Sequence, residues 1–227
     1  MSAGSIRTRV RAEMTEEIKQ VARRHLATEG ANLSLRAVAR EMGMVSSAVY
    51  RYFASRDELL TALIVDAYAD LADAVEAADA AIADRADLTG RWLAVCHAVR
   101  DWALAHPAEY ALLFGSPVPG YAAPPDTTTQ AARTPATLVG VIADGVRAGR
   151  LTEPAELPEV VRADLAPIRE SFAPTLSESM LAQAMAAWMQ LFGMVSFELF
   201  GQLNNGVNAR REFFDHQVRT LARQLGL

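Results

Sequence analysis

The chain has little of what metal centres and catalytic sites usually require. It holds one cysteine, Cys96, so no intrachain disulfide can form, and four scattered histidines, His25, His97, His106 and His216. It has no G-x-S-x-G nucleophile turn, no glycine-rich phosphate loop and no H-E-x-x-H helix. We therefore expect no enzyme, no metal site and no cofactor. The single cysteine and the absence of a signal peptide at the amino terminus predict a cytoplasmic protein.

The sequence also lacks alternating strand patterns and internal repeats, whereas apolar residues recur at helical spacing throughout. This favours an all-α fold with helices near residues 10–28, 34–42, 46–53, 55–83, 88–106, 107–114, 136–148, 158–170, 177–202 and 208–225. A stretch rich in Pro, Gly and Thr, from Gly115 to Pro135, interrupts the series. We interpret it either as a mobile lid or as a plain surface loop.

Charge is distributed unevenly along the chain. Residues 1–60 hold ten Lys and Arg against seven Asp and Glu, a net charge of +3, whereas residues 61–227 hold twelve against twenty, a net charge of −8. A mildly basic first segment suits phosphate contact, although a solvated mixed-charge surface gives the same count. Ser5–Arg11 is a short basic arm that is either a DNA-contacting strand or a frayed, solvated terminus.

The most informative segment runs from residue 34 to residue 60. Its first part predicts a short helix beginning at Ser34, whose hydroxyl is placed to cap the helix, with Leu33 and Val38 positioned to pack across the cap. Gly43 follows where a helix needs a left-handed stop. A tight turn and a second helix are expected next.

That second helix is predicted near residues 46–53. Val49 and Phe53 lie four residues apart and face the interior, which leaves an opposite, polar face composed of Ser46, Ser47, Tyr50 and Arg51. An S-x-x-E capping box at residues 55–58 then begins a long helix with an apolar stripe. Two short helices around a tight turn suit the major groove of DNA.

These features resemble the DNA-binding head of the TetR family of bacterial one-component regulators. The resemblance rests on the turn glycine, the aromatic end of the second helix and the basic-acidic-acidic-Leu-Leu start of the next one, here Gly43, Tyr50-Arg51-Tyr52-Phe53 and Arg56-Asp57-Glu58-Leu59-Leu60. It extends back through Ile18, Ala22, Leu26 and Gly30, and covers about a quarter of the chain. Val45 departs from the family pattern, in which a small polar capping residue is common, so the second helix is expected to start at Ser46.

The resemblance implies a set of DNA contacts at matching positions. The candidates are Ser34, Arg36, Ser46, Ser47, Ala48, Tyr50, Arg51, Tyr52 and Arg56. Arg36, Ser46, Ser47 and Arg51 are the expected base-edge or near-base contacts, and Ala48 is placed to meet a thymine methyl. Tyr50, Tyr52 and Arg56 are expected to hold phosphates.

The second part of the chain resembles one class of TetR-type carboxy-terminal domain, the WHG type. The shared segments are His106-Pro107-Ala108-Glu109-Tyr110, Phe114-Gly115 and Trp188 to Gly193, in which Phe192 replaces the histidine of the Trp-x-x-x-His-Gly signature. The resemblance implies a DNA-binding domain over residues 1–60 and a ligand-binding and dimerisation domain over residues 61–227. If that histidine contacts ligand in relatives, its loss here favours a more apolar ligand.

Aromatic, sulfur-containing and histidine side chains in this second part are candidates for a ligand pocket, although packed core is the alternative for each. The candidates are Trp92, Cys96, His97, Tyr110, Phe114, Trp188, Met189 and Phe192. For His97 the alternative is a structural histidine with its hydrogen bonds satisfied.

The stretch from Met180 to Phe200 is apolar enough to resemble a membrane span. Polar residues interrupt it at Gln183, Gln190, Ser196 and Glu198, and a lipid-embedded helix would have to bury all four. A buried or subunit-facing helix is the better interpretation, with no membrane partner. The helices near 177–202 and 208–225 could close a four-helix dimer interface, which is the family's usual mode, or form only an intramolecular hairpin.

Together these features predict a homodimeric repressor on a pseudo-palindromic operator in double-stranded DNA, released by a small apolar ligand. Its recognition helices would enter successive major grooves about 34 Å apart. The alternative is a helical protein that binds small molecules or lipids and does not bind DNA.

Overall fold

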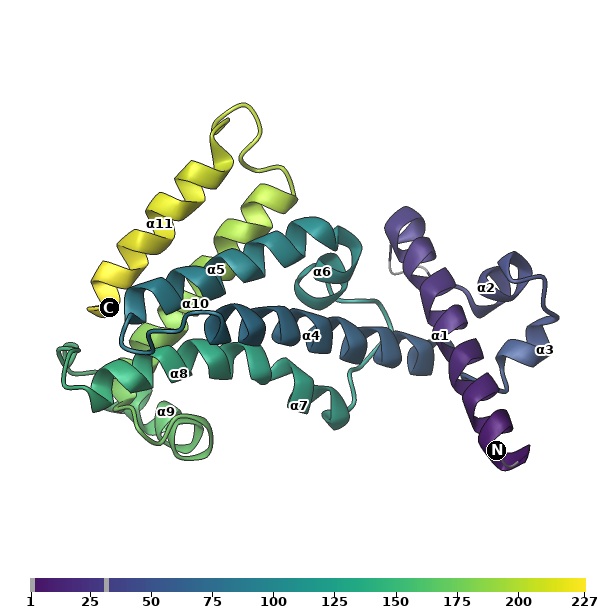
Figure 1. Ribbon diagram of the computed structural model, residues 1–227, viewed down its shortest axis with the longest axis horizontal. Helices are drawn as coiled ribbons and strands as arrows, with labels where there is room; N and C mark the ends of the chain where they lie inside the picture. The colour runs from purple at the N-terminus through teal and green to yellow at the C-terminus, as the bar shows by residue number, and fades with distance from the viewer. Residues whose placement is uncertain (1–2, 31–32) are drawn as a thin grey trace. The chain divides into compact units, whose positions relative to one another are not determined.

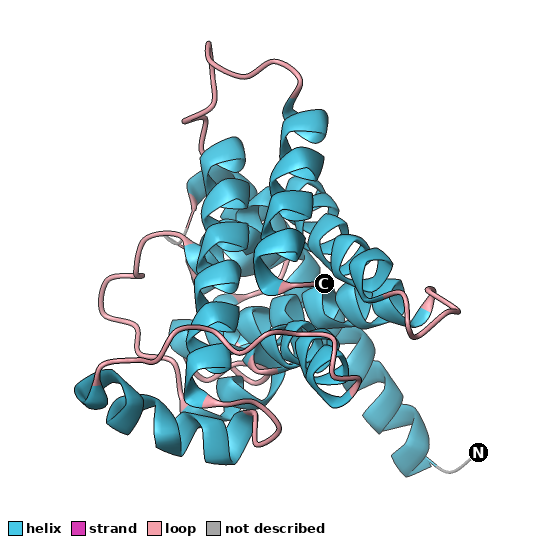
Figure 2. Ribbon diagram, turned by 90° about the vertical axis from the view of Figure 1, so that its left-hand side faces the viewer, coloured by secondary structure: helices cyan, strands magenta, loops and turns pink. Residues whose placement is uncertain are grey.

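The computed structural model describes residues 3–30 and 33–227, and within these ranges it contains helices, turns and loops but no strand (Figure 2). The elements in chain order, labelled in Figure 1 except η1, are α1 (Ala3–Glu29), α2 (Leu35–Glu41), α3 (Ser46–Val49), α4 (Arg56–Ala80), α5 (Leu88–Ala105), α6 (Pro107–Phe114), the 3-10 helix η1 (Pro125–Thr127), α7 (Thr128–Ala131), α8 (Arg133–Arg147), α9 (Glu159–Phe172), α10 (Glu178–Leu199) and α11 (Arg210–Leu225). The expected all-α fold, with an amino-terminal helix-turn-helix and a larger helical remainder, is confirmed.

The chain folds into two compact units. The first comprises Met1–Tyr68 and His106–Thr128, and the second comprises Ala69–Ala105 and Thr129–Leu227. The first packing unit therefore extends past residue 60 and includes α6 and the segment after it. A functional boundary at residue 60 stays a prediction.

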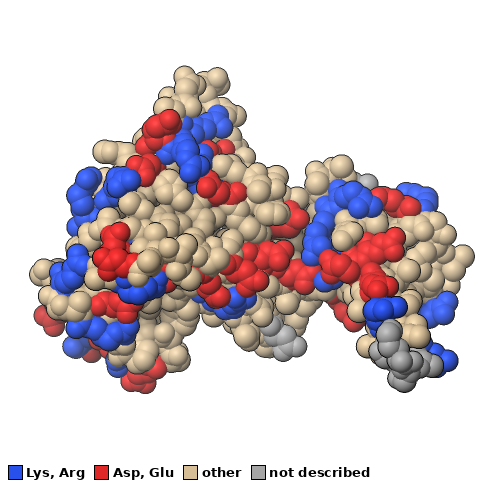
Figure 3. Space-filling model, viewed as in Figure 1, with Lys and Arg blue, Asp and Glu red and all other residues tan. Residues whose placement is uncertain are grey.

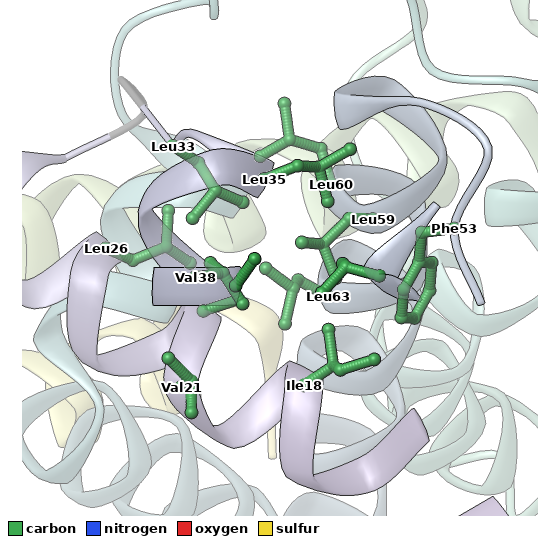
Figure 4. Close-up of a cluster of buried hydrophobic side chains, with 13 residues drawn as sticks. Ile18, Val21, Leu26, Leu33, Leu35, Val38, Phe53, Leu59, Leu60 and Leu63 are labelled. Atoms are coloured by element: carbon green, nitrogen blue, oxygen red, sulfur yellow. The ribbon is translucent and has the colours of Figure 1, made fainter. Parts of the chain in front are cut away.

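The core of the first unit is built from apolar side chains that point toward one another from α1, α2, α3, α4 and the residues that flank α2 and α3 (Figure 4). Its members are Ile18, Val21, Ala22, Leu26, Leu33, Leu35, Val38, Ala39, Val49, Phe53, Leu59, Leu60 and Leu63, each at most 5% exposed. Within α1 the spacing of three and four residues places these side chains on one face of the helix. This core fixes the positions of α2 and α3.

The segment after α6 also packs on this core. Ala108 and Leu112 of α6, then Val118 and Tyr121, contact the buried cluster, and the Tyr121 and Thr61 hydroxyls lie 2.9 Å apart in a hydrogen bond. The interpretation of residues 115–135 as a single lid or loop is wrong, because η1, α7 and the first residues of α8 lie within it.

The amino-terminal arm is helical, which also differs from the expectation of a strand or a frayed terminus. Residues 5–11 belong to α1, which begins at Ala3 rather than near residue 10. Arg11 explains part of this, since its Nη2 donates to the Arg51 carbonyl at 3.0 Å and its guanidinium lies 5.3 Å from the centre of the Tyr52 ring. This contact holds the helix against the end of the helix-turn-helix.

The second unit buries charged groups only in pairs within the part that the structure describes. Arg91 on α5 donates to Asp79 at 2.8 Å and to Asp144 on α8 at 2.6 Å. On α5, Arg100 donates to both carboxylate oxygens of Glu198 on α10, from Nε at 2.8 Å and from Nη2 at 2.6 Å. The Arg100 side chain is 7% exposed and the Glu198 side chain 6% exposed. Because an isolated buried charge is costly, these pairs fix the relative register of α4, α5, α8 and α10.

Helix α10 is long and apolar enough to cross a membrane by length and composition. One face of this helix nevertheless packs inside the second unit, where Met180, Leu181, Leu191 and Val195 are at most 2% exposed, whereas Met189 and Phe197 are exposed. The buried Glu198 pair joins this helix to α5. The helix is thus partly buried, which agrees with the expectation of a buried or subunit-facing helix.

The Arg100–Glu198 pair gives a stability test. Glu198→Ala should lower the free energy of unfolding by about 3–5 kcal/mol, because it removes the buried bidentate partner of Arg100 and leaves only the exposed Asp101 carboxylate, at 3.4 Å. Urea denaturation followed by circular dichroism at fixed protein concentration would measure this. The matched control is Arg219→Ala, which removes an exposed pair with Asp215 and should cost less than about 1 kcal/mol. Equal effects of the two substitutions would contradict the role given to the buried pair.

Candidate nucleic-acid interface

The turn between α2 and α3 is a Schellman motif. The Gly43 amide donates to the Arg40 carbonyl at 3.1 Å, and the Met44 amide donates to the Ala39 carbonyl at 2.8 Å. Gly43 has φ of +65°, and a Cβ added there would meet nothing within 4 Å. The glycine is therefore required for its backbone conformation and not for space.

Helix α3 starts at Ser46, as expected, but its α-helical part ends at Val49 instead of near Phe53. The hydrogen bonds explain the difference. The Arg51 amide donates to Ala48 and the Tyr52 amide to Val49, so the helix tightens into i→i+3 bonds after its first turn. The polar outer face is kept, because residues 50–52 continue as helical turns.

The two predicted caps differ in outcome. Ser34 occupies the N-cap position of α2, but its hydroxyl makes no capping bond, so that detail of the prediction is wrong. At the start of α4, Ser55 Oγ accepts from the Glu58 amide at 3.1 Å, and the Glu58 carboxylate accepts from the Ala54 amide. The capping box is therefore formed, with its return bond one residue earlier than the usual pattern.

The predicted DNA-contacting residues gather around α2, α3 and the start of α4. Arg36, Ser47, Tyr50 and Arg51 are exposed, whereas Ser34, Ser46, Ala48, Tyr52 and Arg56 are partly buried. An open groove brings several of them together; its lining is Leu33, Ser34, Leu35, Arg36, Tyr50, Ala54, Ser55 and Arg56. The Arg56 Nε donates to the Leu33 carbonyl at 3.2 Å, so part of this side chain also braces the groove.

Three cations of α1 away from this face, Lys19, Arg23 and Arg24, are neutralised by acids of the first unit. Lys19 and Arg23 both donate to Asp66, at 2.6 and 2.7 Å, and each also pairs with Glu16. Burial alone would lower the pKa of Lys19, but the hydrogen bonds to Asp66 and Glu16 outweigh it and raise that pKa.

The outer end of α2 is neutralised by a second cluster. Arg24 and the buried His25 share Glu41, with His25 Nε2 at 2.7 Å from the carboxylate. Hydrogen bonds from Arg24 and then His25 lower the pKa of Glu41. His25 is thus a buried histidine that this carboxylate holds in place.

The arginines on the outer face are different. The guanidinium groups of Arg36, Arg40 and Arg51 are exposed and have no hydrogen bond or ion pair with any residue that the structure describes. Arg40 was not among the residues predicted to contact DNA, although it lies four residues after Arg36 and so on the same side of α2. Unpaired guanidinium groups are suited to contact phosphates and guanine edges. Figure 3 shows, by contrast, acidic side chains gathered over α4.

The predicted ligand-pocket residues are not brought together as one lining. Trp92 and Cys96 are buried in the core of the second unit, where Trp92 Nε1 donates to the Val218 carbonyl at 3.0 Å, and burial raises the pKa of the Cys96 thiol. His97 Nε2 lies 3.1 Å from Asp215 and its ring packs edge-on against Phe214. One ring nitrogen of His97 is therefore hydrogen-bonded, whereas its buried Nδ1 has no partner among the described residues, and the alternative of a fully satisfied structural histidine stays a prediction.

The other candidates are dispersed. Tyr110 and Phe114 belong to the first unit, where their rings lie 5.0 Å apart. Trp188 and Phe192 pack edge to face on α10, and Met189 is exposed. Trp188 alone among the eight lines a small cavity between α8 and α10. That the eight contact a ligand stays a prediction.

The first unit therefore presents two short helices around a glycine turn, with unpaired arginines on the outer face. This arrangement defines a helix-turn-helix regulator of transcription. Residues 18–63 match the sequence profile described as "Bacterial regulatory proteins, tetR family", and residues 92–221 match "Tetracyclin repressor-like, C-terminal domain". The second match covers more than half of the chain, and the chain belongs to the TetR family.

Relatives that match over nearly the whole chain are also described as regulators of transcription. The HTH-type transcriptional regulators Rv1816 of Mycobacterium tuberculosis and Mb1846 of Mycobacterium bovis are each 43% identical over 220 residues, which cover 93% of this chain and 92% of theirs. The crystal structure of SCO4313 has a TM-score of 0.78 at 39% identity, over 94% of this chain and 97% of that one.

A more distant structure, the TetR family regulator PfmR from Thermus thermophilus, shares the fold with a TM-score of 0.61 at 16% identity, over 91% of this chain and 97% of that one. The family is one of non-enzymatic regulators that bind operator DNA.

The turn glycine gives a second test. Gly43→Ala should destabilise the protein by about 1–2 kcal/mol, because alanine is strained at positive φ. Gly140→Ala is the matched control: Gly140 lies in α8, its added Cβ would also meet nothing, and alanine there should stabilise by about 0.5–1 kcal/mol. Denaturant unfolding of both variants should give shifts of opposite sign. A Gly43→Ala protein as stable as the parent would refute the strain argument.

Proposed function

We propose that this protein is a homodimeric, cytoplasmic repressor that binds a pseudo-palindromic operator and is released by a small, mainly apolar ligand. The observation that carries the DNA-binding part is the division of charge in the first unit. Lys19, Arg23 and Arg24 are bound to Asp66, Glu16 and Glu41, whereas the guanidinium groups of Arg36 and Arg51 beside the turn have no described partner. Those unpaired groups can exchange water and counterions for DNA.

We assign roles on this face by chemistry. Arg36 and Arg51 can each fork onto a guanine edge in the major groove, with Ser46 and Ser47 close to the bases and Ala48 against a thymine methyl. Phosphate contacts would come from the other polar groups at the rim, namely Ser34, Tyr50, Tyr52 and Arg56. Arg40 extends the positive row along α2.

We place the dimer interface on α10 and α11. Four large apolar side chains there are unusually exposed within a single chain: Met189 at 63%, Phe197 at 56%, Phe200 at 45% and Phe213 at 38%. Exposed aromatic and methionine side chains concentrated on two neighbouring helices are typical of a protein interface. Two such helices from each subunit would form a four-helix bundle.

A dimer accounts for both recognition and release. Two recognition helices about 34 Å apart would read successive major grooves. A ligand releases the operator only if it binds better to a dimer whose heads lack that spacing.

Selection from random duplex DNA, followed by sequencing and repeated over a salt series, would test the proposal. We expect enrichment of a two-fold symmetric motif, with affinity falling steeply as salt rises. A folded protein that enriches no motif at any salt would overturn the proposal and favour a helical binding protein that does not contact DNA.

The roles of the arginines can be separated by substitution. Arg36→Ala and Arg51→Ala should each cost about 1–3 kcal/mol on the preferred operator and relax base preference, whereas Arg56→Ala should weaken all sequences alike. Arg24→Ala is the matched control, because Arg24 is exposed but already bound to Glu41. Fluorescence anisotropy on operator and point-changed duplexes would measure these effects. Equal losses on every sequence for all three variants would refute the division of roles.

The interface can be tested separately. Met189→Asp should raise the dimer dissociation constant at least about 30-fold, because a buried interface anchor is typically worth about 2 kcal/mol or more. Val160→Asp is the control, since Val160 is 70% exposed on α9, outside the proposed interface, and should leave dimerisation unchanged. Sedimentation velocity over a dilution series would distinguish the two. A dimer equally affected by both variants would place the interface elsewhere.

A further inference from the structure

The second unit contains a cavity of about 240 Å³ at the corner where α10, the chain after it and α11 meet. It is lined by Met194, Phe197, Glu198, Leu203, Arg210, Phe213 and Phe214. None of these residues belongs to the ligand pocket predicted from sequence. Five of the seven are apolar, so the walls suit a hydrocarbon or aromatic body.

Only one of the two charged groups in this lining is neutralised by a described partner. Both carboxylate oxygens of Glu198 accept hydrogen bonds from Arg100, which also lies 5.6 Å from the centre of the Phe214 ring. Glu198 thus brings no free negative charge to the cavity. Its pair with Arg100 forms a closed, neutral part of the wall.

Arg210 is the second charged residue in the lining of the cavity. Its Nη2 donates to Asn204 Oδ1 at 2.6 Å and its Nε approaches the Val207 carbonyl at 3.4 Å, but it has no carboxylate partner among the described residues. The side chain is only partly exposed. A half-buried guanidinium beside apolar walls is a costly group that an anion would stabilise.

The chain before α11 holds Arg210 in this position. Gly201 has φ of +83°, and a Cβ there would lie 2.8 Å from the side-chain amide nitrogen of Asn204, the residue that binds Arg210. The Leu203 amide donates to the Phe197 carbonyl, and the Asn204 amide donates to Gly201. The corner is therefore a hydrogen-bonded structure that orients one guanidinium at an apolar cavity.

We propose that this cavity binds an apolar molecule carrying a single carboxylate, with the carboxylate on Arg210 and the apolar body against Met194, Leu203 and Phe213. A neutral ligand would bury Arg210 further without a counter-charge, and a cation would be repelled. A carboxylate matches the fork of a guanidinium in shape and charge. The small volume, with one unneutralised cation among the described lining residues, disfavours a large polyanion.

This binding needs neither DNA nor the dimer. Its regulatory consequence rests on the proposed function, because Phe197 and Phe213 belong both to the cavity and to the proposed interface. An anion seated there would alter the packing of the two helices that would join the subunits.

Isothermal titration of the full chain with octanoate, and with octanol as the uncharged analogue, would test the site. We expect saturable octanoate binding that is at least about tenfold tighter than octanol binding, since a charge-assisted hydrogen bond contributes about 1.5–3 kcal/mol. Arg210→Gln should remove this advantage, and Arg210→Lys should retain part of it. The matched control is Arg211→Gln, because Arg211 is exposed, pairs with Asp101 and does not line the cavity.

Leu203→Trp, which fills the cavity, should abolish octanoate binding while the fold, checked by circular dichroism, is kept. Equal affinity for octanoate and octanol, unchanged binding in folded Arg210→Gln, or full binding in Leu203→Trp would each overturn the inference. Octanoate binding with the expected variant pattern supports the site whether or not the protein binds DNA. Failure to bind any duplex would then count against the proposed function alone.

Discussion

The pairing of buried charge is the constraint on which the structure depends. The second unit carries Arg91 and Arg100 in its interior, and each is held by carboxylates on other helices. Removing water from a guanidinium costs several kcal/mol, which a well-placed carboxylate offsets. Apolar packing alone lets helices slide along one another, whereas a bidentate pair does not. These pairs therefore set the register in which α4, α5, α8 and α10 pack.

The need to pair charge also points to candidate binding sites, where a cation has no described carboxylate partner. In the first unit, Lys19, Arg23 and Arg24 are bound to acids, and Arg36, Arg40 and Arg51 beside the glycine turn have no described partner. In the second unit, Arg210 lines an apolar cavity with no carboxylate partner among the described residues. Because these guanidinium groups lie on the outer face of the first unit or line an apolar cavity, and have no described carboxylate partner, each is available to an external anion: phosphates at the first site and a carboxylate at the second.

The glycine turn and several helices were predictable because their signals in the sequence are local. Gly43 predicted the turn because a left-handed residue at a helix end is a short-range requirement. Apolar spacing predicted helices near 88–106, 107–114 and 208–225, and they form over residues 88–105, 107–114 and 210–225. Non-local contacts were not predictable. The early start of α1 depends on Arg11 meeting Arg51, and the packing of Tyr121 on the first core depends on Thr61. The position of Arg210 at the cavity depends on its bond to Asn204 and on the left-handed backbone at Gly201, and spacing in the sequence does not reveal that contact.

The two sets of unpaired cations differ in their electrostatic surroundings, and this difference shapes how they can work together. Arg36 and Arg51 are exposed, so their attraction for DNA is screened by salt and summed over several contacts. Arg210 lies partly buried against apolar walls, where screening is weak. DNA affinity should therefore depend far more on ionic strength than carboxylate affinity does. If the two sites are coupled, reciprocity requires DNA to weaken carboxylate binding by the factor with which the carboxylate weakens DNA binding. A carboxylate affinity that is unchanged when operator DNA is bound would show that Arg210 serves a site without regulatory coupling.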